Sequence, residues 1–152
     1  MKIIITEEQK KKLFIPRKLS GEDSRYAKWN KEQPIVNGIQ INQYDLDGRK
    51  QGYWETYNDN GEVNTKGNYK DDKKDGYWED EYDYGEVNGK GSYINDKKDG
   101  YWEYYWDTGE LFKKGSYKDG KKDGIWEEYF KDGEFWYEGE YKNGKYIRDI
   151  RI

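Results

Sequence analysis

A 24-residue repeat is the feature that most restricts how this chain can fold. Five columns of residues recur with this period over four copies, and one copy reads approximately G-Y-W-E-x-Y-x-D-x-G-E-V-x-x-K-G-x-Y-K-D-x-K-K-D. A repeat of this length is one supersecondary unit, which buries its apolar residues by stacking on its neighbours. In the first copy, the five columns begin at Gly52, Trp54, Gly61, Gly67 and Tyr69.

Each copy contains two strand-like stretches separated by turns. In the first copy, residues 53–57 alternate and are rich in aromatic side chains, and residues 63–70 follow them. Between them, residues 59–62 (Asp-Asn-Gly-Glu) are typical of a short turn whose glycine has a positive φ. Residues 71–76 join one copy to the next, and we interpret them as a longer polar loop. The sequence therefore predicts an all-β fold, an elongated single-layer antiparallel β-meander of hairpin repeats.

The first turn predicts a register between the two strands of each hairpin. If it pairs position 58 with position 63, Trp54 lies opposite Gly67, and each repeat glutamate lies opposite a lysine. An indole can then cover a glycine that would otherwise leave a gap in the sheet. The glutamate–lysine pairs are expected on the opposite face, because successive side chains of a strand point to opposite sides.

The longer loop predicts a second register, between one copy and the next. If it pairs position 70 with position 77, each repeat tyrosine lies beside the tryptophan of the following copy. Tryptophan, glycine and tyrosine then form one continuous aromatic band, which we predict to be the core. The residues of this predicted core are Trp54, Trp78, Trp102, Trp126, Tyr69, Tyr93, Tyr117 and Tyr141.

The composition and pattern of the sequence divide the chain into three segments. Residues 1–37 are predicted to be a short mixed N-terminal cap, with a strand at Ile3–Ile5, a brief helix to about Phe14 and a polar loop. Residues 38–147 form the hairpin array. The tail alternates cleanly, so residues 148–152 are predicted to end a closing edge strand.

Composition argues against catalysis, metal binding and cofactor binding. The chain has no Cys and no His, so thiolate sites and the commonest general base are excluded. The repeated glutamates resemble a paired-carboxylate site, but four like copies, each facing a lysine, indicate a structural role. The Asp-rich loops fail the pattern of an EF-hand, because Lys73 and its repeats stand where a third-position ligand is needed. We predict a non-enzyme without a cofactor.

Charge and hydropathy limit the partners. The net charge is −4, with acidic and basic residues mixed along the chain, which disfavours nucleic acid and anionic membranes. No apolar run approaches the roughly 18 residues that span a bilayer, and the run after Met1 is too short for a signal peptide. We therefore expect a cytoplasmic protein.

The repeats resemble MORN repeats, and more closely the bacterial MORN-variant repeats associated with antitoxin components of toxin–antitoxin systems. The resemblance covers about residues 38–147 and rests on G-Y-W-E (52–55, 76–79 and 100–103), G-I-W-E (124–127), D-T-G-E (107–110) and G-S-Y-K-D-G-K-K-D-G (115–124). It implies an elongated, twisted single-layer sheet, a role in protein scaffolding and, in some eukaryotic members, contact with membrane lipids. The opening nine residues resemble the starts of some tailed-phage proteins. Together these resemblances imply a bacterial or phage-infected bacterial cell.

Three functions remain open from the sequence. The leading hypothesis is a protein-binding scaffold with an aromatic and charged sheet face, antitoxin-like or active in phage–host interaction. The second is binding of a glycan or nucleobase by stacked Tyr and Trp, and the third is peripheral lipid contact. Edge strands make a homodimer a further hypothesis. The aromatic surface opposite the core is either a packing face or a recognition face. The candidate binding residues are Tyr57, Tyr101, Tyr105, Trp106, Tyr129 and Trp136.

Overall fold

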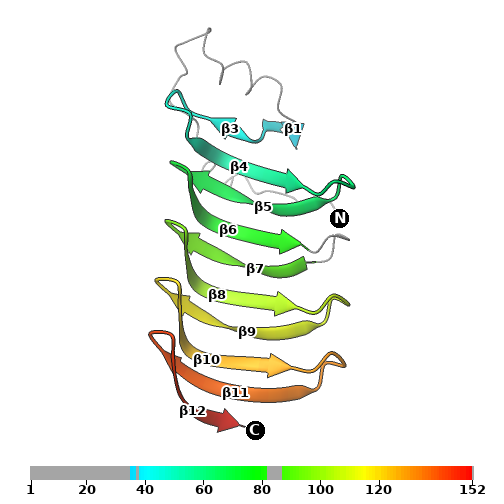
Figure 1. Cartoon of the computed structure of the whole chain (residues 1–152), viewed down its shortest axis with the longest axis vertical. Helices are drawn as coiled ribbons and strands as arrows, with labels where there is room; N and C mark the ends of the chain where they lie inside the picture. The colour runs from blue at the N-terminus through cyan, green and yellow to red at the C-terminus, as the bar shows by residue number, and fades with distance from the viewer. Residues whose placement is uncertain (1–34, 37, 82–86, 152) are drawn as a thin grey trace. The chain divides into compact units, whose positions relative to one another are not determined.

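The computed structural model describes residues 35–36, 38–81 and 87–151, and these residues form strands and turns without a helix. The predicted all-β class is confirmed. Ten antiparallel strands lie in one open sheet, and each is hydrogen-bonded to its neighbours in the chain (Figure 1). The predicted strand at Ile3–Ile5 and the helix to about Phe14 lie outside the described residues. No helix among the described residues is long and apolar enough to cross a membrane.

The strand bounds follow the repeat. A separate two-stranded sheet pairs β1 (Ile35–Val36) with β2 (Ile39–Gln40). The ten strands of the main sheet are β3 (Gln43–Tyr44), β4 (Lys50–Tyr57), β5 (Val63–Lys70), β6 (Lys73–Glu81), β7 (Val87–Ile94), β8 (Lys97–Tyr105), β9 (Leu111–Lys118), β10 (Lys121–Tyr129), β11 (Phe135–Lys142) and β12 (Lys145–Arg151). By compactness, the chain divides into a smaller unit, residues 1–54 with 69–73, and a larger unit, residues 55–68 with 74–152.

In the three hairpins whose turns are described, the short turn has the predicted glycine with a positive φ. Gly61, Gly109 and Gly133 have φ between 84° and 90°. In each of these turns, the N–H of the residue three positions before the glycine donates to the carbonyl of the residue after it, as Trp106 does to Glu110 at 2.8 Å. The hairpin turn of the second copy lies outside the described residues.

The longer loop predicted between copies is wrong. The connections are two-residue turns, and both residues of each turn have a positive φ, as in Asp119 (51°) and Gly120 (79°). Turns of this kind twist in the same sense as the strands that flank them. The Lys-Lys-Asp-Gly residues after the first three turns are consequently strand, as at the start of β10. The four turns are Asp71-Asp72, Asn95-Asp96, Asp119-Gly120 and Asn143-Gly144.

The register predicted within hairpins is confirmed from the tryptophan to the glutamate but is wrong beside the turn, where Leu111 lies opposite Tyr105 and the register shifts between Tyr104 and Tyr105. The register predicted between copies is wrong. Within hairpins, Trp102 lies opposite Gly115, and the same pairing recurs in the neighbouring copies. Between copies, the tyrosine does not lie opposite the following tryptophan, because Tyr117 pairs with Lys122 and Trp126 pairs with Gly115. The two-residue turn sets the pairing of Lys121 and Lys122, and an irregularity in β10 between Lys122 and Trp126 then shifts the register. Gly115 therefore lies between two tryptophans.

Buried indoles form the core of the larger unit. Trp78, Trp102 and Trp126 are at most 1% exposed. A methyl group at Gly115 would overlap the ring of Trp126, so each indole occupies the space over the glycine of the preceding copy. The indole N–H of Trp126 also donates to the carbonyl of Ser116 at 3.0 Å, which fixes the ring in position. The tyrosine rings pack edge-on against these indoles, with Tyr117 at 5.0 Å from Trp126.

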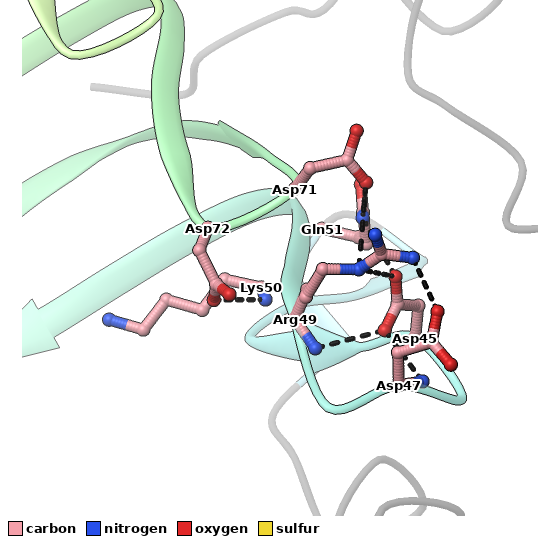
Figure 2. Close-up of polar contacts among 7 residues, drawn as sticks. All are labelled: Asp45, Asp47, Arg49, Lys50, Gln51, Asp71 and Asp72. Carbon is pink, nitrogen blue, oxygen red and sulfur yellow. Dashed lines mark hydrogen bonds and ion pairs between the residues drawn. The ribbon is translucent and has the colours of Figure 1, made fainter.

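The smaller unit combines an indole with a polar network. Trp54 is 6% exposed, and its ring lies 5.7 Å from that of Tyr69. Beside it, Asp45 accepts hydrogen bonds from the backbone N–H groups of Asp47 and Arg49 and from the Arg49 guanidinium (Figure 2). The amide of the buried Gln51 donates to Asp45 and, at 2.7 Å, to Asp71.

The final strand is a shortened copy of the repeat. In β12, Ile150 stands at the position of the repeat tryptophan, and Arg151 lies opposite Glu138, where other copies place a glutamate opposite a lysine. No following indole covers Gly139, and the phenol of Tyr137 lies over this glycine instead. Two register shifts interrupt the pairing of β12 with β11.

Candidate binding face

Alternation along the strands of the larger unit separates two faces. One, here called the indole face, carries Trp78, Trp102 and Trp126 with the tyrosines packed against them. The other, here called the ion-pair face, carries the repeat glutamates with their lysines and a second set of tyrosines. Adjacent residues show the contrast, because Trp102 is fully buried and Tyr101 is 54% exposed.

Lysines close the indole face. The ammonium group of Lys98 lies 4.1 Å from the Trp102 ring centroid and 4.8 Å from that of Tyr104. Lys74 and Lys122 lie over Trp78 and Trp126 in the same manner, at 4.1 and 4.3 Å. Burial lowers the pKa of Lys98 and of Lys122, although the ring faces attract the cation.

Sequence reasoning missed this lysine column. Its signal was present, because Lys74, Lys98 and Lys122 recur with the 24-residue period. The predicted long loop places these lysines in solvent, and that prediction follows from the wrong turn length. In the smaller unit, Lys50 lies over Trp54 and Tyr69 at 4.8 and 4.7 Å, which repeats the arrangement.

Ion pairs cross the opposite face between successive copies. Lys66 binds Glu79 at 2.8 Å, and two further pairs follow at 3.1 and 3.0 Å, Lys90 with Glu103 and Lys114 with Glu127. The register also places Lys90 opposite Glu79 of its own copy, as predicted, but the ion pairs of these three lysines join one copy to the next. Each pair is only partly exposed, which strengthens it relative to a pair in bulk water.

Tyrosines complete these pairs. The Tyr105 hydroxyl donates to Glu103 at 2.7 Å, and Lys90 lies over the Tyr105 ring at 4.8 Å. Hydrogen bonds from Tyr105 and Lys90 lower the pKa of Glu103 despite partial burial. Tyr129 binds Glu127 in the same way, and Tyr57, at the end of β4, donates to Glu55. The glutamate column is thereby held in a fixed geometry.

An exposed column runs beside the ion pairs. Tyr77, Tyr101 and Ile125 stand at equivalent positions of three copies and are 50%, 54% and 40% exposed. Partial burial and the nearby Glu79 raise the pKa of Tyr77 to about 12, so its hydroxyl is a hydrogen-bond donor at neutral pH.

Aromatic pairs lie at the ends of the last two hairpins. The rings of Trp106 and Phe112 are 4.3 Å apart, and those of Phe130 and Trp136 are 5.6 Å apart. The indole N–H of Trp106 donates to the carbonyl of Tyr129 at 3.3 Å, which links the two hairpins. Phe130 and Trp136 are about half exposed.

The six candidate binding residues thus fall into distinct places. Tyr101, Tyr105 and Tyr129 lie on the ion-pair face. Tyr105 and Tyr129 contact the glutamates and lysines of the ion pairs. Trp106 and Trp136 lie at the hairpin ends, and Tyr57 lies beside Glu55 on β4. Two residues of the same surfaces were not predicted, Ile125 and Phe112. Ile125 replaces a repeat tyrosine and Phe112 stands at a variable position, so no aromatic repeat marked either residue.

The carboxylates show no arrangement suited to metal binding. Within the described segments, no group of three potential ligands could hold a metal ion. The aspartates of the smaller unit accept hydrogen bonds from Arg49, Gln51 and backbone N–H groups, including Asp72 from the Lys50 N–H at 2.8 Å (Figure 2).

Comparison with known proteins adds no assignment. No protein-family model matches the chain, and no curated protein matches its sequence. Function must therefore be inferred from the chemistry of the two faces.

Proposed function

We propose that this chain is a non-catalytic protein-binding scaffold and that a partner protein contacts its ion-pair face. The observation that carries the proposal is the exposed column of Tyr77, Tyr101 and Ile125 beside the ordered Lys–Glu–Tyr contacts. Half-exposed tyrosines next to fixed charges supply the two components of protein interfaces, apolar anchors and directional polar groups.

The indole face is less suited to recognition. Its tryptophans are buried, and lysines lie over the rings of Trp102 and Trp126, so these indoles offer little ring face for a sugar or a nucleobase to stack on. On the ion-pair face, Lys–Glu pairs cross the surface where a stacked ligand would need aromatic ring faces. These features favour a protein partner over a glycan or nucleobase.

The same ion pairs disfavour lipid contact. Lys66, Lys90 and Lys114 are each bound to a glutamate, so they present little net positive charge to an anionic membrane. Scaffolding is also the role that the resemblance to MORN repeats implies. An antitoxin-like or phage–host role, in the cytoplasm of a bacterial cell, is the finer form of the proposal.

Dimerisation through the edge strand receives less support. Two register shifts interrupt β12, and Arg148 and Asp149 lie at its centre. If two copies of β12 pair symmetrically about the central residue of the strand, Arg148 lies opposite its own copy. Bulges and charges of this kind protect sheet edges from pairing.

The test is affinity capture from bacterial lysate, with and without phage infection, using the wild-type chain and a Tyr77→Ser/Tyr101→Ser variant. We expect a protein that is captured in stoichiometric amount by the wild type and lost by the variant. The control is Ile147→Ser, which changes a residue of similar exposure (52%) on β12. Capture that the tyrosine variant leaves unchanged would place the partner on another surface.

A further inference from the structure

The last two hairpins carry a surface that the first hairpin lacks. The hairpin-end aromatic patch comprises Trp106, Phe112, Phe130 and Trp136. Trp106 and Phe130 are equivalent positions of two copies, and so are Phe112 and Trp136, with Trp and Phe exchanged. The first copy has asparagines at both positions, Asn58 and Asn64, so the patch is not a requirement of the repeat.

The patch has a fixed base and an open part. Trp106 is held by its contact with Phe112 and by its hydrogen bond to the Tyr129 carbonyl. Phe130 and Trp136, in contact with each other, are 47% and 48% exposed. Adjacent large aromatic side chains that stay exposed on a rigid base are typical centres of binding energy in protein interfaces.

Cations lie over many aromatic rings of this protein, and Phe112 is the member of the patch that is covered in this way. Lys113 lies over Phe112 at 5.0 Å, Lys114 over Tyr129 at 5.5 Å, and the Arg151 guanidinium over Phe135 at 4.6 Å. Among the described residues, no lysine or arginine lies over Trp106, Phe130 or Trp136. Their ring faces are therefore available to a cation from outside the chain.

The charge around the patch has the sign that attracts such a cation. The two hairpin turns contain four carboxylates and one lysine, and Lys131 is already paired with Asp107 at 2.5 Å. The remaining acidic residues are Glu110, Asp132 and Glu134. Lys113, over Phe112, is a second lysine beside the patch, and the four carboxylates outnumber the two lysines. This excess of negative charge favours a basic partner segment and repels phosphate groups.

We propose that the hairpin-end aromatic patch binds a basic segment of the partner protein, with an arginine or lysine side chain over the rings of Phe130 and Trp136. The inference rests on the proposed function, because it assigns part of the same partner's interface. Arginine fits the site better than lysine, because its planar guanidinium stacks on aromatic rings and also donates to carboxylates.

The test uses fluorescein-labelled peptides of eight residues, alternating arginine or lysine with glycine, and measures fluorescence anisotropy against the full chain at physiological salt. We expect the arginine peptide to bind more tightly than the lysine peptide, and the corresponding glutamate peptide not to bind. Trp136→Ala should weaken binding of the arginine peptide by about tenfold, the order of one cation–π contact.

Charge has a matched control in the first hairpin. Glu134→Gln should weaken peptide binding several-fold and preserves the fold, because this side chain is exposed. Glu62→Gln changes the equivalent residue of the first copy, beside Asn58 instead of an aromatic ring, and should leave binding unchanged. Equal effects of the two substitutions would show that binding follows net charge alone and would overturn the inference.

The two proposals fail in different ways. Arginine-peptide binding that Trp136→Ala does not change overturns the basic-segment inference, whatever the capture experiment shows. A captured partner that depends on Tyr77 and Tyr101 but survives Trp136→Ala supports the scaffold and removes the patch from its interface. Loss of capture with the tyrosine variant and also with Trp136→Ala, but not with Ile147→Ser, supports both.

Discussion

The two faces of the larger unit use neighbouring residues for different purposes. On the indole face, Trp102 is fully buried, its N–H is bonded to the Ser92 carbonyl at 3.0 Å, and Lys98 lies over its ring. On the ion-pair face, Tyr101, one residue earlier in the same strand, is 54% exposed. In each repeat, the side chains on one side of the strand are therefore buried and stabilise the fold, and those on the other side form an accessible surface. A sheet without a second layer can have a core only if its own side chains cover it.

The largest expected effect comes from removing one indole. Trp102→Ala should destabilise the chain by about 3–5 kcal/mol, because it leaves a cavity between Gly91 and the neighbouring tyrosines. Urea unfolding followed by circular dichroism measures the difference. Tyr101→Ala is the matched control on the other face, and we expect a cost of about 1 kcal/mol or less. Similar losses in the free energy of unfolding for the two substitutions would contradict the conclusion that the indole face stabilises the fold more than the ion-pair face does.

A smaller effect is expected where a glycine lies under an indole. Gly115→Ala places a methyl group in the space of the Trp126 ring, and we expect a cost of about 1–3 kcal/mol from overpacking. Ser116→Ala, the next residue on the opposite side of the strand, should change stability by about 0.5 kcal/mol or less. Thermal unfolding of both variants provides the comparison. A Gly115→Ala variant as stable as Ser116→Ala would show that the indole moves aside without cost.

The fold could be predicted from the sequence because the repeat fixes both strands of each hairpin. The predicted pair of Trp102 with Gly115 forms, but the turn is tighter than predicted, because Leu111 lies opposite Tyr105 and not opposite Trp106. A register shift between Tyr104 and Tyr105 restores the predicted pairing farther along the strands. The connection between copies was misread for a chemical reason. Asp119-Gly120 and Asn143-Gly144 are typical two-residue hairpin turns, but the equivalent residues in the first two copies lack the glycine.

Hydrogen bonding explains how the earlier turns form without that glycine. Asp96 has a φ of 66°, and its carboxylate accepts a bond of 2.7 Å from the N–H of Lys74, which lies in β6 of the preceding copy. In the later turns the roles are reversed, because the turn supplies the N–H and a strand of the preceding copy supplies the carboxylate. Asp99, in β8, accepts a bond from the Asp119 N–H at 3.2 Å. A long-range bond of this kind has no local sequence signal, so the turn length could not be read from the first copies.

The sequence indicated which tyrosines lie opposite the indoles, but it did not indicate which charged groups surround the two sets of rings. Tyr101, Tyr105 and Tyr129 were identified because aromatic side chains on a thin sheet must occupy both faces. The lysine column over the indoles was not, because its place depends on the turn that was misread. The partners in the ion pairs were also shifted by one copy, since both neighbouring strands offer Lys90 a glutamate and only the contact geometry selects Glu103.

The smallest expected effect is a difference between the two faces in how their contribution to stability depends on pH. Hydrogen bonds from Tyr129 and Lys114 lower the pKa of Glu127, against the opposing effect of burial. A carboxylate whose folded pKa is lowered contributes stability above its unfolded pKa, about 4.5, and loses it as the pH falls through the folded value. Glu127→Gln should therefore cost up to about 1 kcal/mol at pH 7, and this difference from wild type should vanish in acid.

The indole face is expected to respond at the other end of the pH range. Burial lowers the pKa of Lys98, so its protonated form opposes folding, and this penalty is relieved as the pH rises through the folded pKa toward the unfolded value of about 10.5. Acid should therefore weaken the ion-pair face, and alkali should relieve the indole face. Urea unfolding of wild type, Glu127→Gln and Lys98→Met between pH 3 and pH 10 tests this. If the difference between Glu127→Gln and wild type stays constant down to pH 3, the Lys114–Glu127 pair does not stabilise the fold, and the ion-pair face is ordered by backbone pairing alone.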